Sequence, residues 1–70
     1  MNLGIYEASC LNILLKRQPL NLYDERSGDG QCIAVEKLIE LGWVQEDAYG
    51  LHTLIKSEQE CKSIIDYWFN

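Results

Sequence analysis

Proline occurs once and glycine five times in the 70 residues, and only one histidine is present. No apolar run approaches the ~20 residues that a membrane span requires. These shortages exclude a collagenous repeat and a low-complexity linker, and a hydrophobic share of 47% excludes a disordered tail. The first residues, from Met1 to Glu7, lack the basic stretch of a secretory signal. We therefore expect one cytoplasmic domain that spans residues 1–70.

Cysteine is also scarce, because Cys10, Cys32 and Cys61 form an odd set without any Cys-x-x-Cys pair. A disulfide scaffold requires a denser, even set. Three cysteines and the lone His52 match no familiar zinc-ligand spacing. We expect three buried, reduced thiols, no metal and no cofactor. One core of this size seldom supplies more than about 3–5 kcal/mol, so a dimer or a partner is the expected supplement.

Two segments of apolar spacing predict helices in the first part of the chain. Residues 3–17 are apolar on almost every side, which is typical of a central, buried helix. Residues 31–41 carry apolar side chains at spacings of three and four. Gly42 follows where a C-terminal cap belongs, and Asp29 is placed to cap the start of this helix.

A last helix is predicted after Ser57, which forms a capping-box pattern with Glu60. Its expected core face holds four residues at helical spacing: Cys61, Ile64, Ile65 and Trp68.

The remaining segments predict a hairpin and leave one stretch undecided. Residues 43–46 and 51–55 are typical of two short strands, with a turn at 47–50 between them. Residues 18–30 fit either a short helix or a strand, and end in a loop composition.

The order helix, undecided segment, helix, hairpin, helix resembles a winged helix-turn-helix domain. Residues 34–47, AVEKLIELGWVQED, resemble the L-x-x-L-G-[LW]-[VI] end of a recognition helix and the first wing strand. Residues 49–57, YGLHTLIKS, resemble the wing turn and second strand, although Ser57 stands where the family continues with T-x-K-G. The resemblance covers residues 31–69. It implies an α+β fold of three to four helices with a two-stranded hairpin as the wing.

Charge favours a protein partner over DNA. The chain holds 11 acidic and 6 basic residues, a net charge of −5, and residues 31–70 alone hold seven acids and three bases, a net of −4. Because phosphate binding requires Lys or Arg, the half that would face DNA is poorly suited to it. We expect a small non-enzymatic module that regulates or inhibits a protein with a basic surface. Its size and charge are similar to those of phage or mobile-element inhibitors of host defence, anti-CRISPR proteins among them. The expected acidic face consists of Glu36, Glu40, Glu46 and Asp47.

The alternative is a dimeric winged-helix transcription regulator. Its expected DNA contacts are Gln31, Lys37 and Lys56. Catalysis has little support, since the chain has no phosphate loop and no Ser–His–Asp arrangement with supporting glycines.

Three aromatic residues lie off the predicted core stripes. They are Tyr49, Tyr67 and Phe69. Two interpretations stay open for them: a surface for a partner or a second copy of the chain, since aromatic residues are enriched at interfaces, or burial in the core.

Overall fold

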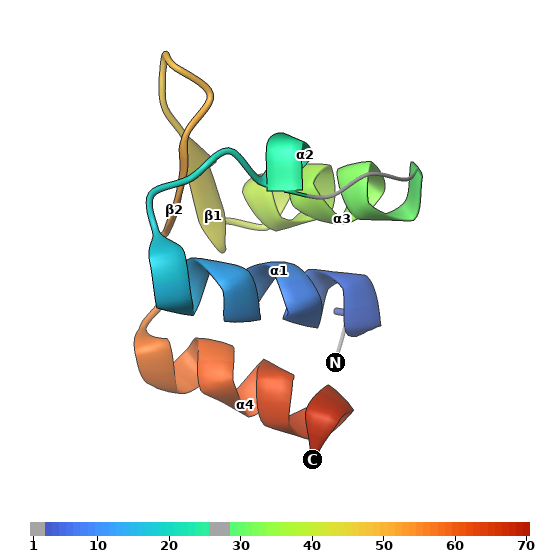
Figure 1. Cartoon of the computed structure of the whole chain (residues 1–70). Coiled ribbons are helices and arrows are strands. Elements are labelled where there is room, and N and C mark those ends of the chain that lie inside the picture. Colours follow the sequence, from blue (N-terminus) through green and yellow to red (C-terminus); the bar gives the residue numbers. More distant parts are fainter. Residues whose placement is uncertain (1–2, 26–28) are drawn as a thin grey trace.

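The computed structural model describes residues 3–25 and 29–70, with the side chains of residues 25 and 29–31 left aside. Within these ranges the chain forms four helices and one two-stranded antiparallel sheet (Figure 1). In chain order the elements are α1 (Ile5–Arg17), α2 (Leu22–Glu25), α3 (Asp29–Glu40), β1 (Val44–Glu46), β2 (His52–Leu54) and α4 (Glu58–Phe69). The predicted α+β class is confirmed, and the layout is consistent with a winged-helix-like domain. No helix in the described part of the chain is both long and apolar enough to cross a membrane.

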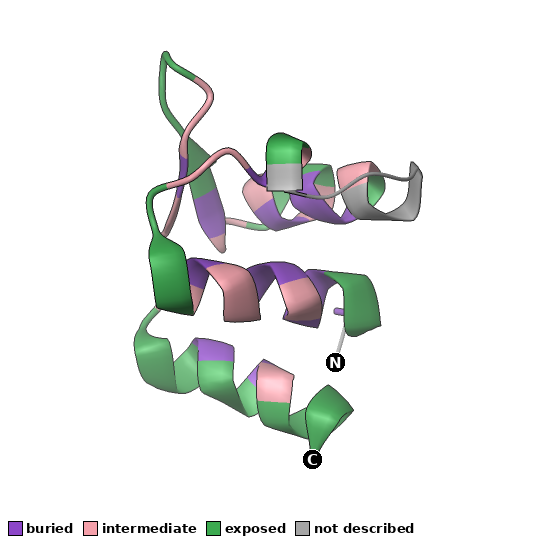
Figure 2. Cartoon of the chain, in the orientation of Figure 1, coloured by how far each residue is buried: buried purple, intermediate pink, exposed green. Residues whose placement is uncertain are grey.

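Helix α1 is the centre of the fold, as predicted. It lies between α4 on one side and α3 with the hairpin on the other (Figure 1). Its fully buried side chains include Ala8, Cys10, Leu11 and Leu14 (Figure 2). The helix begins at Ile5 and not at residue 3, because the Glu7 carboxylate accepts a hydrogen bond from the Gly4 amide and caps the start there.

Helix α3 ends as its sequence predicted. Gly42 has a φ of +84°. The Gly42 amide donates to the Ile39 carbonyl at 3.2 Å, and the Trp43 amide donates to the Leu38 carbonyl at 2.9 Å, which together form a Schellman motif. The helix begins at Asp29, the residue expected to precede it as a cap. Its buried face consists of Ala34, Val35 and Leu38.

The hairpin forms in the predicted place with slightly shorter strands. Val44 pairs with Leu54, and Glu46 pairs with His52. The 47–50 turn closes with Gly50 at a φ of +83°. The Asp47 carboxylate accepts hydrogen bonds from two backbone amides of this turn and therefore fixes its shape.

The undecided segment is partly strand-like and partly helical. Leu20 forms an isolated bridge with His52, in which the His52 amide donates to the Leu20 carbonyl at 2.7 Å. One residue later the chain turns into the short helix α2, whose Tyr23 amide donates to the Asn21 side chain at 2.9 Å. The loop was expected at 27–30; its first two residues lie outside the described ranges, and the prediction was wrong for Asp29 and Gly30, which form the first turn of α3.

Helix α4 buries less than predicted. Ser57 caps it by accepting from the Glu60 amide at 3.2 Å, as expected. Cys61 and Ile64 are buried and Ile65 is half-buried, but Trp68 is 40% exposed, so its assignment to the core face was wrong. The reason is that α4 packs mainly on the outer side of α1, at the edge of the fold (Figure 1).

The cysteines form no disulfide. Cys10 and Cys61 are buried as expected, whereas Cys32 is only half-buried, so the prediction of three buried thiols was wrong for Cys32. It lies in α3 next to the exposed Ile33, at the border between the buried and the exposed side of the helix.

We expect Gly42→Ala to lower the free energy of unfolding by about 1 kcal/mol, because a Cβ disfavours positive φ. No atom lies within 4 Å of the added methyl, so a clash contributes nothing. Gly42→Asn is the matched control and costs less, since Asn tolerates this conformation. Urea denaturation measures both. An Ala variant as stable as the parent chain would contradict the positive φ of Gly42.

Candidate interaction surface

A fully buried histidine joins the hairpin to α2. The His52 Nδ1 atom accepts from the Leu22 amide at 3.0 Å. The ring proton therefore lies on Nε2, which donates to the Glu46 Oε1 atom at 2.9 Å. The Tyr23 ring packs edge-on against the imidazole, with 5.3 Å between ring centroids. Both ring nitrogens are thus satisfied, which a buried polar side chain requires.

This contact gathers acidic side chains from different elements. Burial raises the pKa of the Tyr23 phenol, and the nearby Glu36 and Glu46 carboxylates raise it further. Such charge effects act over short separations. Glu46 of β1 holds the His52 ring on which Tyr23 of α2 packs, and α2 packs against α3, which carries Glu36.

The four residues of the predicted acidic face are all exposed, and they lie on α3, on β1 and at the start of the turn after β1. Glu40 follows Glu36 by one helical turn on α3, and Asp47 follows Glu46 at the start of the turn. Two of the four carboxylates also have structural roles, because Glu46 holds His52 and Asp47 shapes the turn. We call the set the acidic surface; with the exposed Asp24 of α2 it comprises Asp24, Glu36, Glu40, Glu46 and Asp47.

Sequence reasoning missed Tyr23 and Asp24. Both lie in the segment whose structure the sequence left undecided, and the bridge that positions them depends on His52, 32 residues after Leu20. The alternation of apolar and polar residues around Leu20 was the only feature of the local sequence that indicated a strand-like course there.

The cations expected to contact DNA do not form a common patch. The Lys37 ammonium lies 4.0 Å from the buried Glu7 carboxylate of α1. The Lys56 ammonium lies over the Trp43 ring, 5.7 Å from its centroid. Gln31 has a side chain outside the described set. Lys37 and Lys56 are therefore each engaged with a different intramolecular partner.

The three aromatic residues for which exposure and burial both stayed open are exposed, and they lie on two different parts of the fold. Tyr49, in the hairpin turn, is 87% exposed and adjoins the acidic surface. Tyr67 and Phe69 lie at the end of α4. One small rigid partner therefore cannot contact Tyr49 and the end of α4 at the same time.

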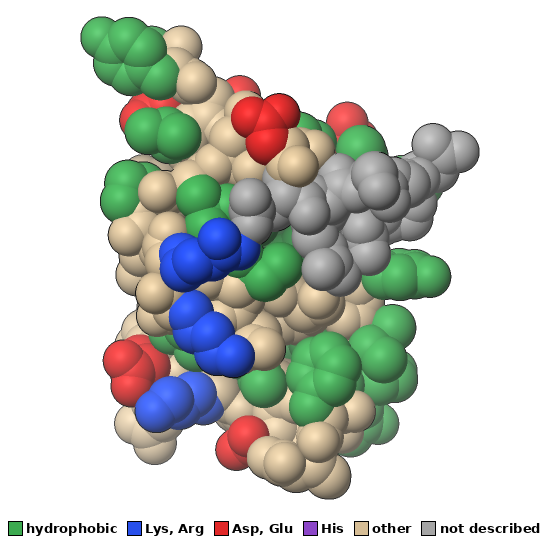
Figure 3. Space-filling view, in the orientation of Figure 1, with side chains coloured by type: hydrophobic (Ala, Val, Ile, Leu, Met, Phe, Trp, Pro, Cys, Tyr) green, Lys and Arg blue, Asp and Glu red, His purple; other side chains and the backbone are tan. Residues whose placement is uncertain are grey.

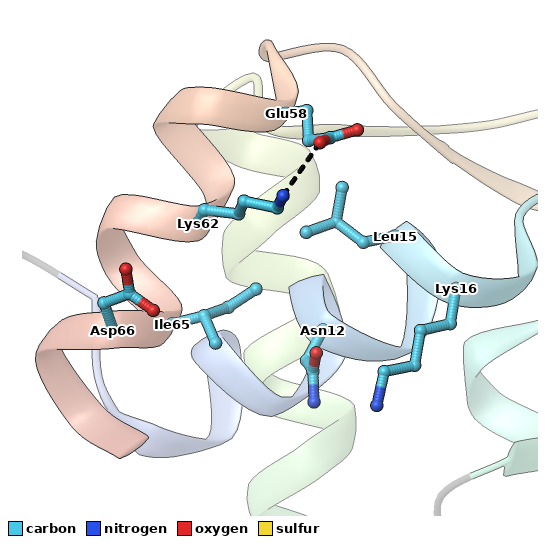
Figure 4. A pocket seen from close by; sticks show the side chains of 7 residues that line it. All are labelled: Asn12, Leu15, Lys16, Glu58, Lys62, Ile65 and Asp66. Carbon is cyan, nitrogen blue, oxygen red and sulfur yellow. Dashed lines mark ion pairs between the residues drawn. The ribbon is translucent and has the colours of Figure 1, made fainter. Parts of the chain in front are cut away.

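A groove of about 510 Å³ lies between α1 and α4 (Figure 4). Leu15 and Ile65 form its apolar part, and the Lys62 ammonium is paired with the Glu58 carboxylate at 3.0 Å. Figure 3 shows Lys and Arg side chains gathered near this junction of α1 and α4, away from the hairpin. The lining holds no nucleophile paired with a base, and no metal-ligand cluster of three residues occurs in the described ranges.

Comparisons with protein-family models, curated proteins and solved structures found no match.

We expect His52→Leu to lower the free energy of unfolding by roughly 2–4 kcal/mol, since it leaves the buried Leu22 amide without an acceptor and Glu46 without a donor. Glu46→Gln is the matched control and costs less, because its amide oxygen still accepts from Nε2. Urea denaturation measures both variants. Small and equal decreases in the free energy of unfolding of the two variants would show that the buried imidazole is not essential for stability.

We expect alkaline pH to destabilise the fold through Cys61. Burial, and to a lesser degree the Glu60 carboxylate, raise the pKa of this thiol. The unfolded chain therefore loses the proton first, so the stabilisation is complete below about pH 8.5 and declines as pH rises further. Unfolding free energies between pH 7 and 9.5 should fall with a slope below about 1.4 kcal/mol per pH unit. Cys61→Ala should flatten that slope; an unchanged slope in the variant contradicts the assignment.

Proposed function

We propose that the chain is a small non-enzymatic module that docks its acidic surface on a basic surface of a partner protein. The observation that carries the proposal is that five exposed carboxylates lie on α2, α3 and the hairpin, which are elements that pack together. In a winged-helix-like layout, α3 stands in the place of the recognition helix and the hairpin stands in the place of the wing. The exposed Tyr49 adds an aromatic anchor beside the charges.

The balance of charge supports a protein partner. On the described part of α2, α3 and the hairpin through residue 56, the acidic surface is opposed by only two cations, Lys37 and Lys56. Each of them is drawn toward another group of the same chain. The resulting negative field speeds encounter with a basic protein and repels nucleic-acid phosphates.

Size and charge are the basis for placing the protein among inhibitors carried by phages or mobile elements, and its sparse, odd cysteine set is the basis for placing it in the cytoplasm. A basic surface that normally binds nucleic acid is the kind of target that such an inhibitor would cover. Competition with the nucleic acid follows directly from this mode of binding.

We expect Glu36→Lys with Glu40→Lys to weaken binding of a fluorescent lysine-rich peptide at least about tenfold, because like charges replace the attraction. Glu60→Lys with Asp66→Lys on α4 is the matched control, since the total charge changes equally, and it should change affinity less than about threefold. Fluorescence anisotropy measures both, and circular dichroism confirms folding.

Three outcomes would overturn the proposal. Equal losses in both double variants would mean that net charge alone attracts the peptide. No binding by the parent chain would remove the acidic surface from the account. Binding of duplex DNA that falls steeply with salt and disappears in Lys37→Glu would favour the transcription regulator.

A further inference from the structure

Five exposed apolar side chains gather at the end of the fold away from the hairpin. They come from the first turn of α1 and the last turn of α4, where Figure 3 shows a cluster of hydrophobic side chains. We call this cluster the aromatic end; it consists of Ile5, Tyr6, Tyr67, Trp68 and Phe69, which are 40–65% exposed.

The aromatic end is held in place before any partner arrives. The Trp68 Nε1 atom donates to the Leu3 carbonyl at 3.1 Å, which ties the end of α4 to the segment before α1. The Tyr67 and Trp68 rings pack edge to face, with 5.3 Å between centroids and an interplanar angle of 81°. Because these rings are already ordered, a partner loses little of its binding energy to fixing them.

From this cluster we infer that the aromatic end binds a second copy of the same chain. The surface is self-complementary in charge, because residues 3–9 and 66–70 hold only two charged side chains. One of them, Glu7, is buried, and the other, Asp66, accepts from the Asn70 side chain at 2.8 Å. A twofold contact therefore brings an aromatic surface with a single exposed side-chain carboxylate, Asp66, against its own copy, and aromatic residues are enriched in interface cores.

The available area matches what a dimer needs. At roughly 100 Å² for each partly exposed side chain, the aromatic end offers about 500 Å² on each copy. Twofold pairing then buries about 1,000 Å² before a polar rim is counted, which reaches the size of a specific interface.

Charge at the far end does not oppose this pairing. The acidic surface lies on α2, α3 and the hairpin, and the longest dimension of the molecule is 32 Å. Repulsion between two acidic surfaces is strongly screened over such separations, since the Debye length is about 8 Å at physiological salt. Pairing leaves both acidic surfaces uncovered, so the inference is independent of the proposed function.

The test is sedimentation velocity of the full chain from low micromolar to near-millimolar concentration. We expect a reversible species of twice the chain mass. Tyr67→Ser with Phe69→Ser should raise its dissociation constant at least about tenfold. Tyr49→Ser in the hairpin turn is the matched control and should leave the constant unchanged. Both sites are solvent-exposed, so circular dichroism should show unaltered folding.

A second measurement follows Trp68 directly. In a Trp43→Phe chain, Trp68 is the only tryptophan, and its fluorescence should shift to shorter wavelength as concentration rises and water leaves the ring. A monomer at every concentration, a dimer equally sensitive to Tyr49→Ser, or a monomer whose aromatic end binds neutral phosphatidylcholine vesicles would each overturn the inference.

Discussion

The fold depends on the hydrogen bonding of one buried imidazole. His52 bridges Leu20 through its backbone and binds both the Leu22 amide and the Glu46 carboxylate through its ring. Without that ring, α2 loses its side-chain hydrogen bond to the hairpin, although the Leu20 bridge and the Gln18 side chain, which accepts from the Leu54 amide at 2.8 Å, still tie the segment after α1 to it. The two hydrogen bonds also select one tautomer, because a proton on Nδ1 would oppose the Leu22 amide. A single side chain thereby sets the position of α2 relative to the wing.

That position determines the chemistry of the surface. Once α2 is fixed, Tyr23 packs on the His52 ring that Glu46 holds, and three elements distant in the sequence carry the exposed carboxylates of the acidic surface. The neighbouring cations are directed elsewhere, Lys37 toward Glu7 and Lys56 toward the Trp43 ring. A winged-helix-like layout then carries a surface whose charge is opposite to that which DNA requires.

The central helix explains how 70 residues can support two different surfaces. Helix α1 packs against both α3 and α4 and supplies four of the twelve buried apolar residues in the described ranges, more than any other element (Figure 2). Helix α4 contacts the rest of the fold through α1, which leaves Tyr67, Trp68 and Phe69 uncovered at its end. The charged and aromatic surfaces consequently lie at opposite ends and do not compete for the same contacts.

The sequence by itself determined the three long helices, the hairpin and its turn, because each depends on local periodicity, caps or a glycine such as Gly42. It also identified the four carboxylates Glu36, Glu40, Glu46 and Asp47 as surface residues. Only the tertiary structure decided the course of residues 18–25, because a bridge to His52 has no local signal. It also decided that Trp68 is exposed and that Lys37 faces Glu7, since both depend on which neighbour packs against the helix.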